Sequence, residues 1–140
     1  YTLSDTLSYT TLFRSSENKR YKIGDSEYVI LKFNPFDKYP IFKNATATSV
    51  NKEEITRAEE IIKDKISYNL SQNKYKRQYV AVINDKGEKL IWINFFYAED
   101  ASSNWKTEIF VAYDGGNYFF RIKVNLTRNT YYDYNENTDS

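Results

Sequence analysis

The spacing of apolar residues predicts one helix, between residues 52 and 68. Apolar side chains recur there every three or four positions, which places them on one face of a helix. This stripe consists of Ile55, Ala58, Ile62 and Ile66. Asn51 and Glu54 have the spacing of a capping box, in which each side chain accepts a hydrogen bond from the backbone N–H of the other residue. The pattern therefore predicts an amphipathic helix that packs on a sheet.

After residue 77 the period of the apolar positions changes to two, which is typical of strands. The predicted strands are residues 79–83, 90–97, 107–113 and 118–126. Asn84-Asp85-Lys86-Gly87 separates the first two and favours a type I turn closed by a left-handed glycine, with a bulge. Asp114-Gly115-Gly116-Asn117 separates the last two and favours a two-residue primed turn. The pattern thus predicts two consecutive hairpins.

Three more segments complete the predicted domain. Residues 27–33 read as a strand that ends before Pro35, and residues 35–48 cross from there to the helix. Residues 128–134 are expected to form a short final edge strand. Together these elements predict a single α+β domain over residues 21–134, with one helix packed on a twisted antiparallel sheet of four to six strands, as in cystatin-like or NTF2-like folds. Residues 135–140 are expected to be a flexible acidic tail.

The first 20 residues are expected to lie outside the domain, as a disordered or artefactual extension. Residues 9–15, YTTLFRS, are the translation of TACACGACGCTCTTCCGATCT, which resembles the end of a common short-read sequencing adapter. The short repeats before them resemble the upstream part of the same adapter. We therefore interpret residues 1–15 as translated adapter DNA and expect the native N-terminus, with any signal peptide, to be missing.

The composition excludes several classes of chemistry. The 140 residues include no His and no Cys. Ser-His-Asp and Cys-His catalysis, His-bound metals, thiolate metal sites and disulfides are therefore all excluded. Only catalysis by carboxylate, Lys or Tyr is left, and no cofactor or metal motif is present, so we expect no cofactor and no enzymatic activity.

Charge gives no reason to expect nucleic acid or a membrane as a partner. The chain carries 20 Lys and Arg against 19 Asp and Glu, a net charge of +1. Lys74, Lys76 and Arg77 alternate with tyrosines, but three cations would bind nucleic acid only weakly. We therefore interpret them as solvent-exposed residues that lead into a strand. No apolar run is long enough for a membrane-spanning segment.

The aromatic residues suggest a binding face. The chain has 14 Tyr, nine Phe and two Trp. In the strand 90–97, Leu90, Trp92 and Phe96 point to one side, and Ile91, Ile93 and Phe95 point to the other. The helix can cover only one of these two faces, so the other apolar face needs a different cover or is exposed. An exposed apolar face usually marks a partner site. The candidate ligand-binding residues are Trp92, Trp105, Tyr97 and Tyr113; the alternative is that the N-terminal strand or residues 35–48 cover this face.

Three stretches resemble a group of small bacterial proteins, without an assigned activity, that are often exported or lipid-anchored. These stretches are YPIFKNATATS, YKRQYVAVINDKGEKLIWIN and DGGNYFFRIKVNLT, and the likeness covers about residues 21–134. Members of the group commonly have Cys near the end of the second hairpin strand and just after the GGN turn. This chain has Asn94-Phe95-Phe96 and Tyr118 there, so a thiol-dependent role is not carried over. The resemblance implies a protein of the cell envelope or a secreted one.

Two functions are compatible with these patterns. The first is a non-catalytic binding or interaction module that takes a protein, peptide or glycan on its aromatic sheet face. The alternative is a small NTF2-like hydrolase or isomerase with a carboxylate base between sheet and helix, which requires a buried carboxylate in a pocket. The candidate carboxylates are Asp100, Glu108 and Asp114.

Overall fold

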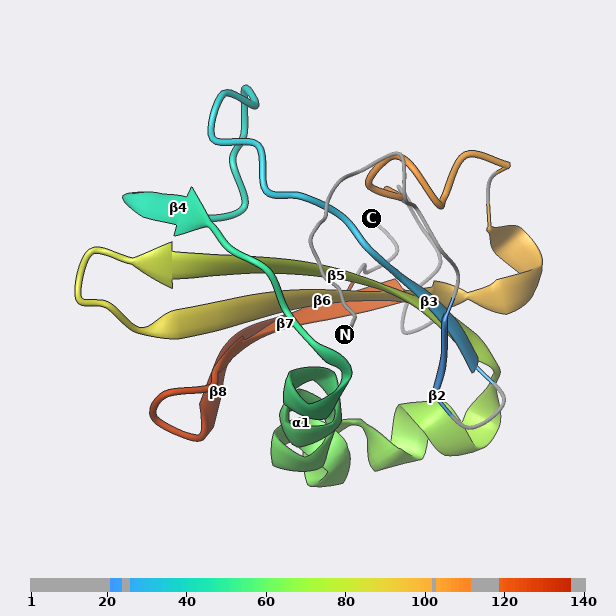
Figure 1. Ribbon diagram of the computed structural model, residues 1–140. Helices are drawn as coiled ribbons and strands as arrows, with labels where there is room; N and C mark the ends of the chain where they lie inside the picture. Colours follow the sequence, from blue (N-terminus) through green and yellow to red (C-terminus); the bar gives the residue numbers. More distant parts are fainter. Residues whose placement is uncertain (1–20, 24–25, 102, 112–118, 137–140) are drawn as a thin grey trace.

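The computed structural model describes residues 21–23, 26–101, 103–111 and 119–136, and its described part is an α+β domain with one long helix on one face of an open, mixed sheet (Figure 1). The elements in chain order are β2 (Tyr21–Ile23), β3 (Ser26–Ile30), β4 (Ala45–Ala47), α1 (Lys52–Gln72), β5 (Tyr75–Asn84), β6 (Lys89–Tyr97), the short 3₁₀ helix η2 (Ala98–Asp100), β7 (Phe119–Asn125) and β8 (Thr130–Glu136). β8 thus includes residues 135 and 136, which the sequence pattern assigned to the tail. The extension, residues 1–20, lies outside the described residues.

The strands follow the order β2-β3-β5-β6-β7-β8, and β4 pairs with the end of β5 that β3 leaves free. All these neighbours are antiparallel except β3 and β5, which are parallel. The chain between β3 and β5 passes through β4 and α1 before it re-enters the sheet, so the two strands can run in the same direction. The sheet is therefore mixed, whereas the sequence pattern predicted an antiparallel one.

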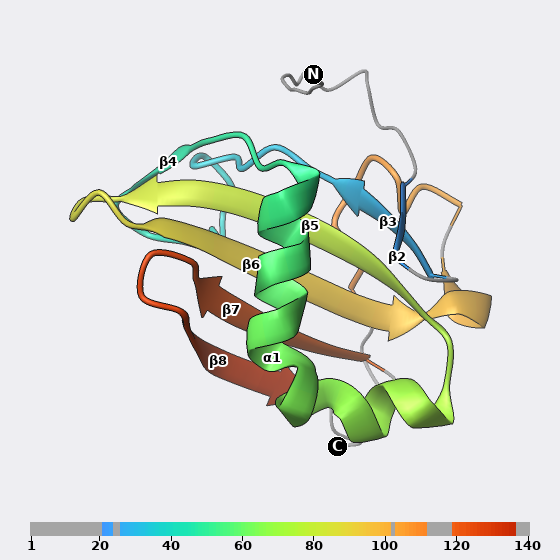
Figure 2. The same cartoon turned by 60° about the horizontal axis from the view of Figure 1, so that its bottom comes forward.

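The helix forms as predicted and runs four residues beyond the predicted end, to Gln72. The capping box is present: the Glu54 N–H donates to Asn51 Oδ1 at 2.8 Å, and the Asn51 N–H donates to Glu54 Oε1 at 3.0 Å. All four residues of the apolar stripe are at most 1% exposed. Figure 2 shows α1 lying across β5, β6 and β7, as a helix with one continuous apolar face should.

The first hairpin is also confirmed. β5 and β6 pair from Tyr75–Tyr97 to Ile83–Lys89, and the Gly87 N–H donates to the Asn84 carbonyl at 3.0 Å to close the turn. Gly87 has a φ of +80°, the left-handed conformation that the bulged turn needs and that glycine adopts without strain.

The prediction of a second hairpin is wrong. Residues 107–111 form no strand, and β6 pairs directly with β7, from Leu90–Asn125 to Phe96–Phe119. Residues 98–101 and 103–111 instead follow the end of β6, and Ala101, Trp105, Ile109 and Phe110 pack on the sheet face opposite α1. Tyr113 and the paired-glycine turn, residues 114–117, lie outside the described residues. The final edge strand does form, as β8, and pairs with β7.

The sheet separates two apolar cores. The inner core, between the sheet and α1, consists of Tyr28, Val50, Ile55, Ala58, Ile62, Ile66, Tyr75, Tyr79, Ala81, Ile91, Ile93, Phe95, Phe120, Ile122, Val124 and Leu126. The outer core, on the opposite face, consists of Val29, Leu31, Phe33, Phe42, Val80, Val82, Leu90, Trp92, Phe96, Trp105 and Phe119. Alternate residues of each central strand therefore serve different cores, as the period of two predicts.

Candidate functional site

The predicted aromatic face is largely buried in the outer core. Trp92 is 7% exposed and Trp105 is 6% exposed, while Tyr97 is half-buried and Tyr113 lies outside the described residues. Trp105 packs edge-on against Phe96, with ring centroids 5.9 Å apart, and the Lys76 ammonium lies 5.0 Å from the centroid of the Trp105 ring. The structure therefore brings the two tryptophans into one core.

Two irregular segments cover this face. The first includes Phe33 and Phe42, whose rings make an edge contact at 6.0 Å, and Ile41 packs beside them. It overlaps the 35–48 segment that the sequence offered as a cover. The second is the chain from η2 to residue 111, where the Phe110 ring stacks on Phe96 at 4.6 Å. The sequence pattern gave no sign of this second cover, because it predicted a strand there.

Two buried side-chain amides attach the second cover to the sheet. Gln78 and Asn94 face each other on β5 and β6, and both are almost fully buried. Gln78 Nε2 donates to the carbonyls of Trp105 and Glu108 at 2.6 and 2.7 Å, and Gln78 Oε1 accepts from the Phe110 N–H at 2.9 Å. Asn94 Nδ2 donates to Gln78 Oε1 at 3.0 Å and to the Phe110 carbonyl at 2.9 Å. These amides thus satisfy backbone groups that have no strand partner.

The β7–β8 part of the outer face is less covered. In the register of the sheet, Trp92 on β6, Lys123 on β7 and Tyr132 on β8 follow one another across the strands. The Lys123 ammonium lies 5.0 Å from the Phe42 ring centroid and 5.9 Å from that of Tyr132, and 3.3 Å from Asp133 Oδ2. Tyr132 is 37% exposed, so its ring borders solvent. We call Lys123, Tyr132 and Asp133 the open face.

A turn within the first cover presents two further aromatic rings that the sequence reasoning did not single out. Asn34 Oδ1 accepts from the Phe36 N–H at 3.0 Å, and Asn34 Nδ2 donates to Asp37 Oδ1 at 3.0 Å. In this hydrogen-bonded turn Phe36 is 91% exposed, and Tyr39, just after it, is 82% exposed. Asn34-Pro35 is a common start for such a turn and was the available signal.

The candidate carboxylates do not form a buried pair. Asp100 and Glu108 are both exposed, and Asp114 lies outside the described residues. A largely buried carboxylate lies instead on α1, at Glu59, whose side chain is 14% exposed. Its Oε2 accepts from Arg77 Nε at 3.0 Å and from the Tyr79 hydroxyl at 2.5 Å. Burial, together with the negative charge of Glu59, raises the pKa of Tyr79 well above its usual range.

Comparison with protein-family models, with curated proteins and with solved structures finds no match to this chain. Among the described residues, α1 is too polar to cross a membrane and no other helix has the length to do so.

Proposed function

We propose that this protein is a non-catalytic binding module that holds a peptide, a protein segment or a glycan on the open face of its sheet. The observation that carries the proposal is the position of Lys123, which lies between Trp92 and Tyr132 in the register of the sheet. Its ammonium lies near the rings of Phe42 and Tyr132. Trp92 and Trp105 of the predicted aromatic face are covered. The proposed binding surface is therefore the β7–β8 half of the same sheet face.

The side chains of the open face offer three kinds of contact. The Tyr132 ring offers a flat apolar surface, its hydroxyl and the Asp133 carboxylate accept hydrogen bonds, and Lys123 donates them. The side chain of Lys123 is 20% exposed and that of Asp133 is 57% exposed, so both are accessible to a ligand. Sugars and peptides combine flat apolar faces with hydrogen-bonding groups, which suits this set. We further propose, from the family resemblance, that the module acts in the bacterial cell envelope or outside the cell.

The experiment is a binding screen of the full chain against peptide and glycan arrays, followed by titration of each hit with Tyr132→Ala. Loss of the Tyr132 ring should weaken binding at least tenfold, because the ring is the exposed apolar part of the surface. Tyr68→Ala is the matched control, since Tyr68 is 67% exposed on α1, the opposite face. Equal affinities of the two variants, or arrays without a hit, would contradict the proposal.

The second candidate, a small hydrolase or isomerase with a carboxylate base, is favoured by one observation: Glu59 is a largely buried carboxylate in the lining of a pocket. A general base needs an oxygen within hydrogen-bonding reach of the substrate proton. Oε2 of Glu59 already binds Arg77 and Tyr79, so only Oε1 could act. Hydrolysis of generic ester or glycoside substrates that is lost in Glu59→Gln would support this candidate over the binding module.

A further inference from the structure

The helix α1 bends, and the inner side of the bend is hollow. Figure 2 shows its last turns running at a steep angle to its first turns. Near the bend the Ser67 hydroxyl donates to the Asp64 carbonyl at 3.4 Å, and further along the Ser71 hydroxyl donates to the Tyr68 carbonyl at 2.6 Å. Such bonds compete with the helical ladder and favour bending. The resulting pocket of about 480 Å³ is within the range of roughly 300–1,000 Å³ that small-molecule sites occupy.

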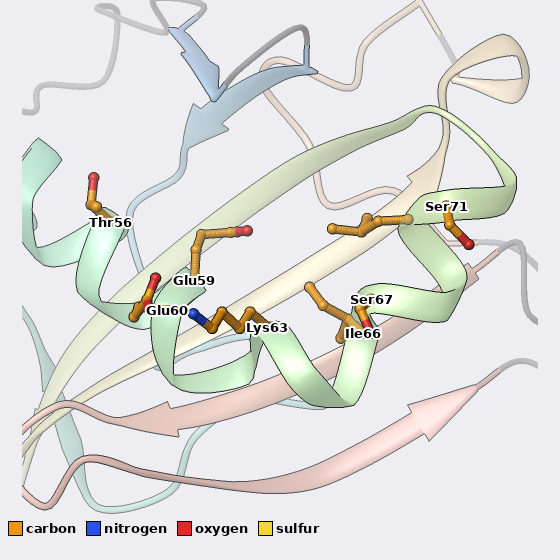
Figure 3. Close-up of a pocket in the computed structure, with 8 residues that line it drawn as sticks. Thr56, Glu59, Glu60, Lys63, Ile66, Ser67 and Ser71 are labelled. Carbon is orange, nitrogen blue, oxygen red and sulfur yellow. Dashed lines mark hydrogen bonds and ion pairs between the residues drawn. The ribbon is translucent and has the colours of Figure 1, made fainter.

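Eight residues of α1 line this pocket, and Figure 3 shows seven of them with labels. The lining residues are Thr56, Glu59, Glu60, Lys63, Ile66, Ser67, Leu70 and Ser71. Ile66 and Leu70 form an apolar part, and Glu59 lies about two turns before Ile66 on the same helix. In Figure 3 the Glu59 side chain points from the helix towards the sheet. The pocket thus has an apolar end and a carboxylate end.

Apart from Lys63, the polar side chains of the lining present hydrogen-bond acceptors. The hydroxyls of Thr56, Ser67 and Ser71 all donate their protons to carbonyls of α1 itself, so they face a ligand with lone pairs only. The one cation of the lining, Lys63, lies 2.7 Å from Glu60 Oε2 and is already paired. The lining therefore favours a ligand that donates hydrogen bonds over an anion.

Glu59 supplies the strongest of these acceptors. Arg77 and Tyr79 both bind its Oε2, and Oε1 accepts no hydrogen bond from the described residues. A carboxylate oxygen in a largely buried side chain gains most from a charged donor, because charge-assisted hydrogen bonds are about twice as strong as neutral ones. Arg77 pairs with Glu59 as Lys63 pairs with Glu60, so the site offers an ammonium the unused lone pairs of Glu59 Oε1 rather than an unpaired charge.

From this geometry we propose that the pocket in the bend of α1 binds a small primary ammonium with a short apolar chain. The ammonium donates to Glu59 Oε1, and the chain lies on Ile66 and Leu70. This site is on the helix side of the sheet, so it is separate from the open face and stands or falls independently of the binding module proposed above.

The test is an NMR titration of the full chain with three probes of equal length: butylammonium, 1-butanol and butyrate. Butylammonium should shift the backbone amides of residues 56–71 and bind at least tenfold more tightly than butanol, and butyrate should leave these amides unchanged. Equal affinity for butylammonium and butanol, or shifts spread over the whole chain, would overturn the proposal.

Variants separate the pocket from general attraction of a cation. Glu59→Gln should weaken butylammonium binding at least tenfold, but it leaves the buried Arg77 without its ion pair and can unfold the chain. Ser67→Phe avoids this, because it fills the pocket from an exposed helix position and should abolish binding. Asp64→Phe is the control: it adds the same ring and removes a carboxylate outside the pocket lining. If Asp64→Phe weakens binding as much as Ser67→Phe, the site is not the pocket.

Discussion

The two faces of the sheet are both covered, but by different means. On the inner face a single helix of 21 residues supplies the apolar cover. On the outer face two segments with little regular structure do so, residues 31–47 and the chain from η2 to residue 111. A helix satisfies its own backbone hydrogen bonds and needs only an apolar stripe to dock. An irregular segment needs partners for its backbone, and Gln78 and Asn94 supply them here.

Because the two covers are held differently, we expect mutations in them to destabilise the protein in different ways. Loss of packing under α1 removes part of the common core and should weaken the whole domain. Loss of the amide pair removes the attachment of one segment and should release that segment before the rest. The following changes test the comparison, from the largest expected effect to the smallest.

Ile62→Ala should lower the free energy of unfolding by about 4 kcal/mol, because it leaves a cavity in the inner core. Ile62 is fully buried on the face of α1 that meets the sheet. Urea denaturation followed by circular dichroism measures the loss, and all probes should report one transition. Ile61→Ala is the matched control, since Ile61 is only partly buried, and it should cost clearly less. Equal losses would mean that the helix does not bury the predicted stripe.

Gln78→Ala should lower the free energy of unfolding by about 2 kcal/mol, because the carbonyls of Trp105 and Glu108 and the Phe110 N–H lose their partner. Hydrogen exchange of the Phe110 amide should accelerate far more than that of the amides in β5 and β6. Asn135→Ala removes an exposed amide on β8 and should change neither quantity. If Phe110 exchanges no faster than the strands, the amide pair does not hold this cover.

The smallest expected effect concerns acid stability at the turn where β5 meets β6. The hydrogen bond from Arg128, followed by that from Asn84, lowers the pKa of Glu88 to about 2. A carboxyl whose pKa is lower in the folded state stabilises it above the unfolded pKa of about 4.5, and this contribution is lost as the pH falls from there to about 2. Glu88→Gln should therefore flatten the dependence of the unfolding free energy on pH in this window.

Asp85→Asn is the control variant for this prediction, because it removes another carboxylate from the same turn and leaves the Arg128–Glu88 contact in place. A wild-type profile as flat as that of Glu88→Gln would contradict the assignment of Glu88. This contact joins the β5–β6 turn to Arg128 between β7 and β8, so it belongs to neither cover and should affect both alike.

Local patterns were sufficient for α1 and for the first hairpin. The stripe from Ile55 to Ile66, the capping box at Asn51 and the left-handed Gly87 each depend on residues within a few positions of one another. Their conformations were therefore predictable without knowledge of the rest of the chain. The same holds for the alternation of β7, where Phe120, Ile122 and Val124 all face α1.

Contacts between distant residues decided the rest. Residues 107–113 alternate like a strand, but Phe110 lies on the outer core because Gln78 and Asn94, 32 and 16 positions earlier, bind its backbone. The candidate site differs from the sequence prediction for the same reason. Trp105 is buried as part of this cover, whereas Lys123 and Tyr132 are neighbours across β7 and β8 through the register of the sheet. The role of Glu59 depends on Arg77 and Tyr79 reaching it from β5. The sequence by itself determined α1, the first hairpin and the alternation of β7, because their signals are local and periodic. The tertiary structure alone decided what covers the outer face, because hydrogen bonds between distant positions leave no period in the chain.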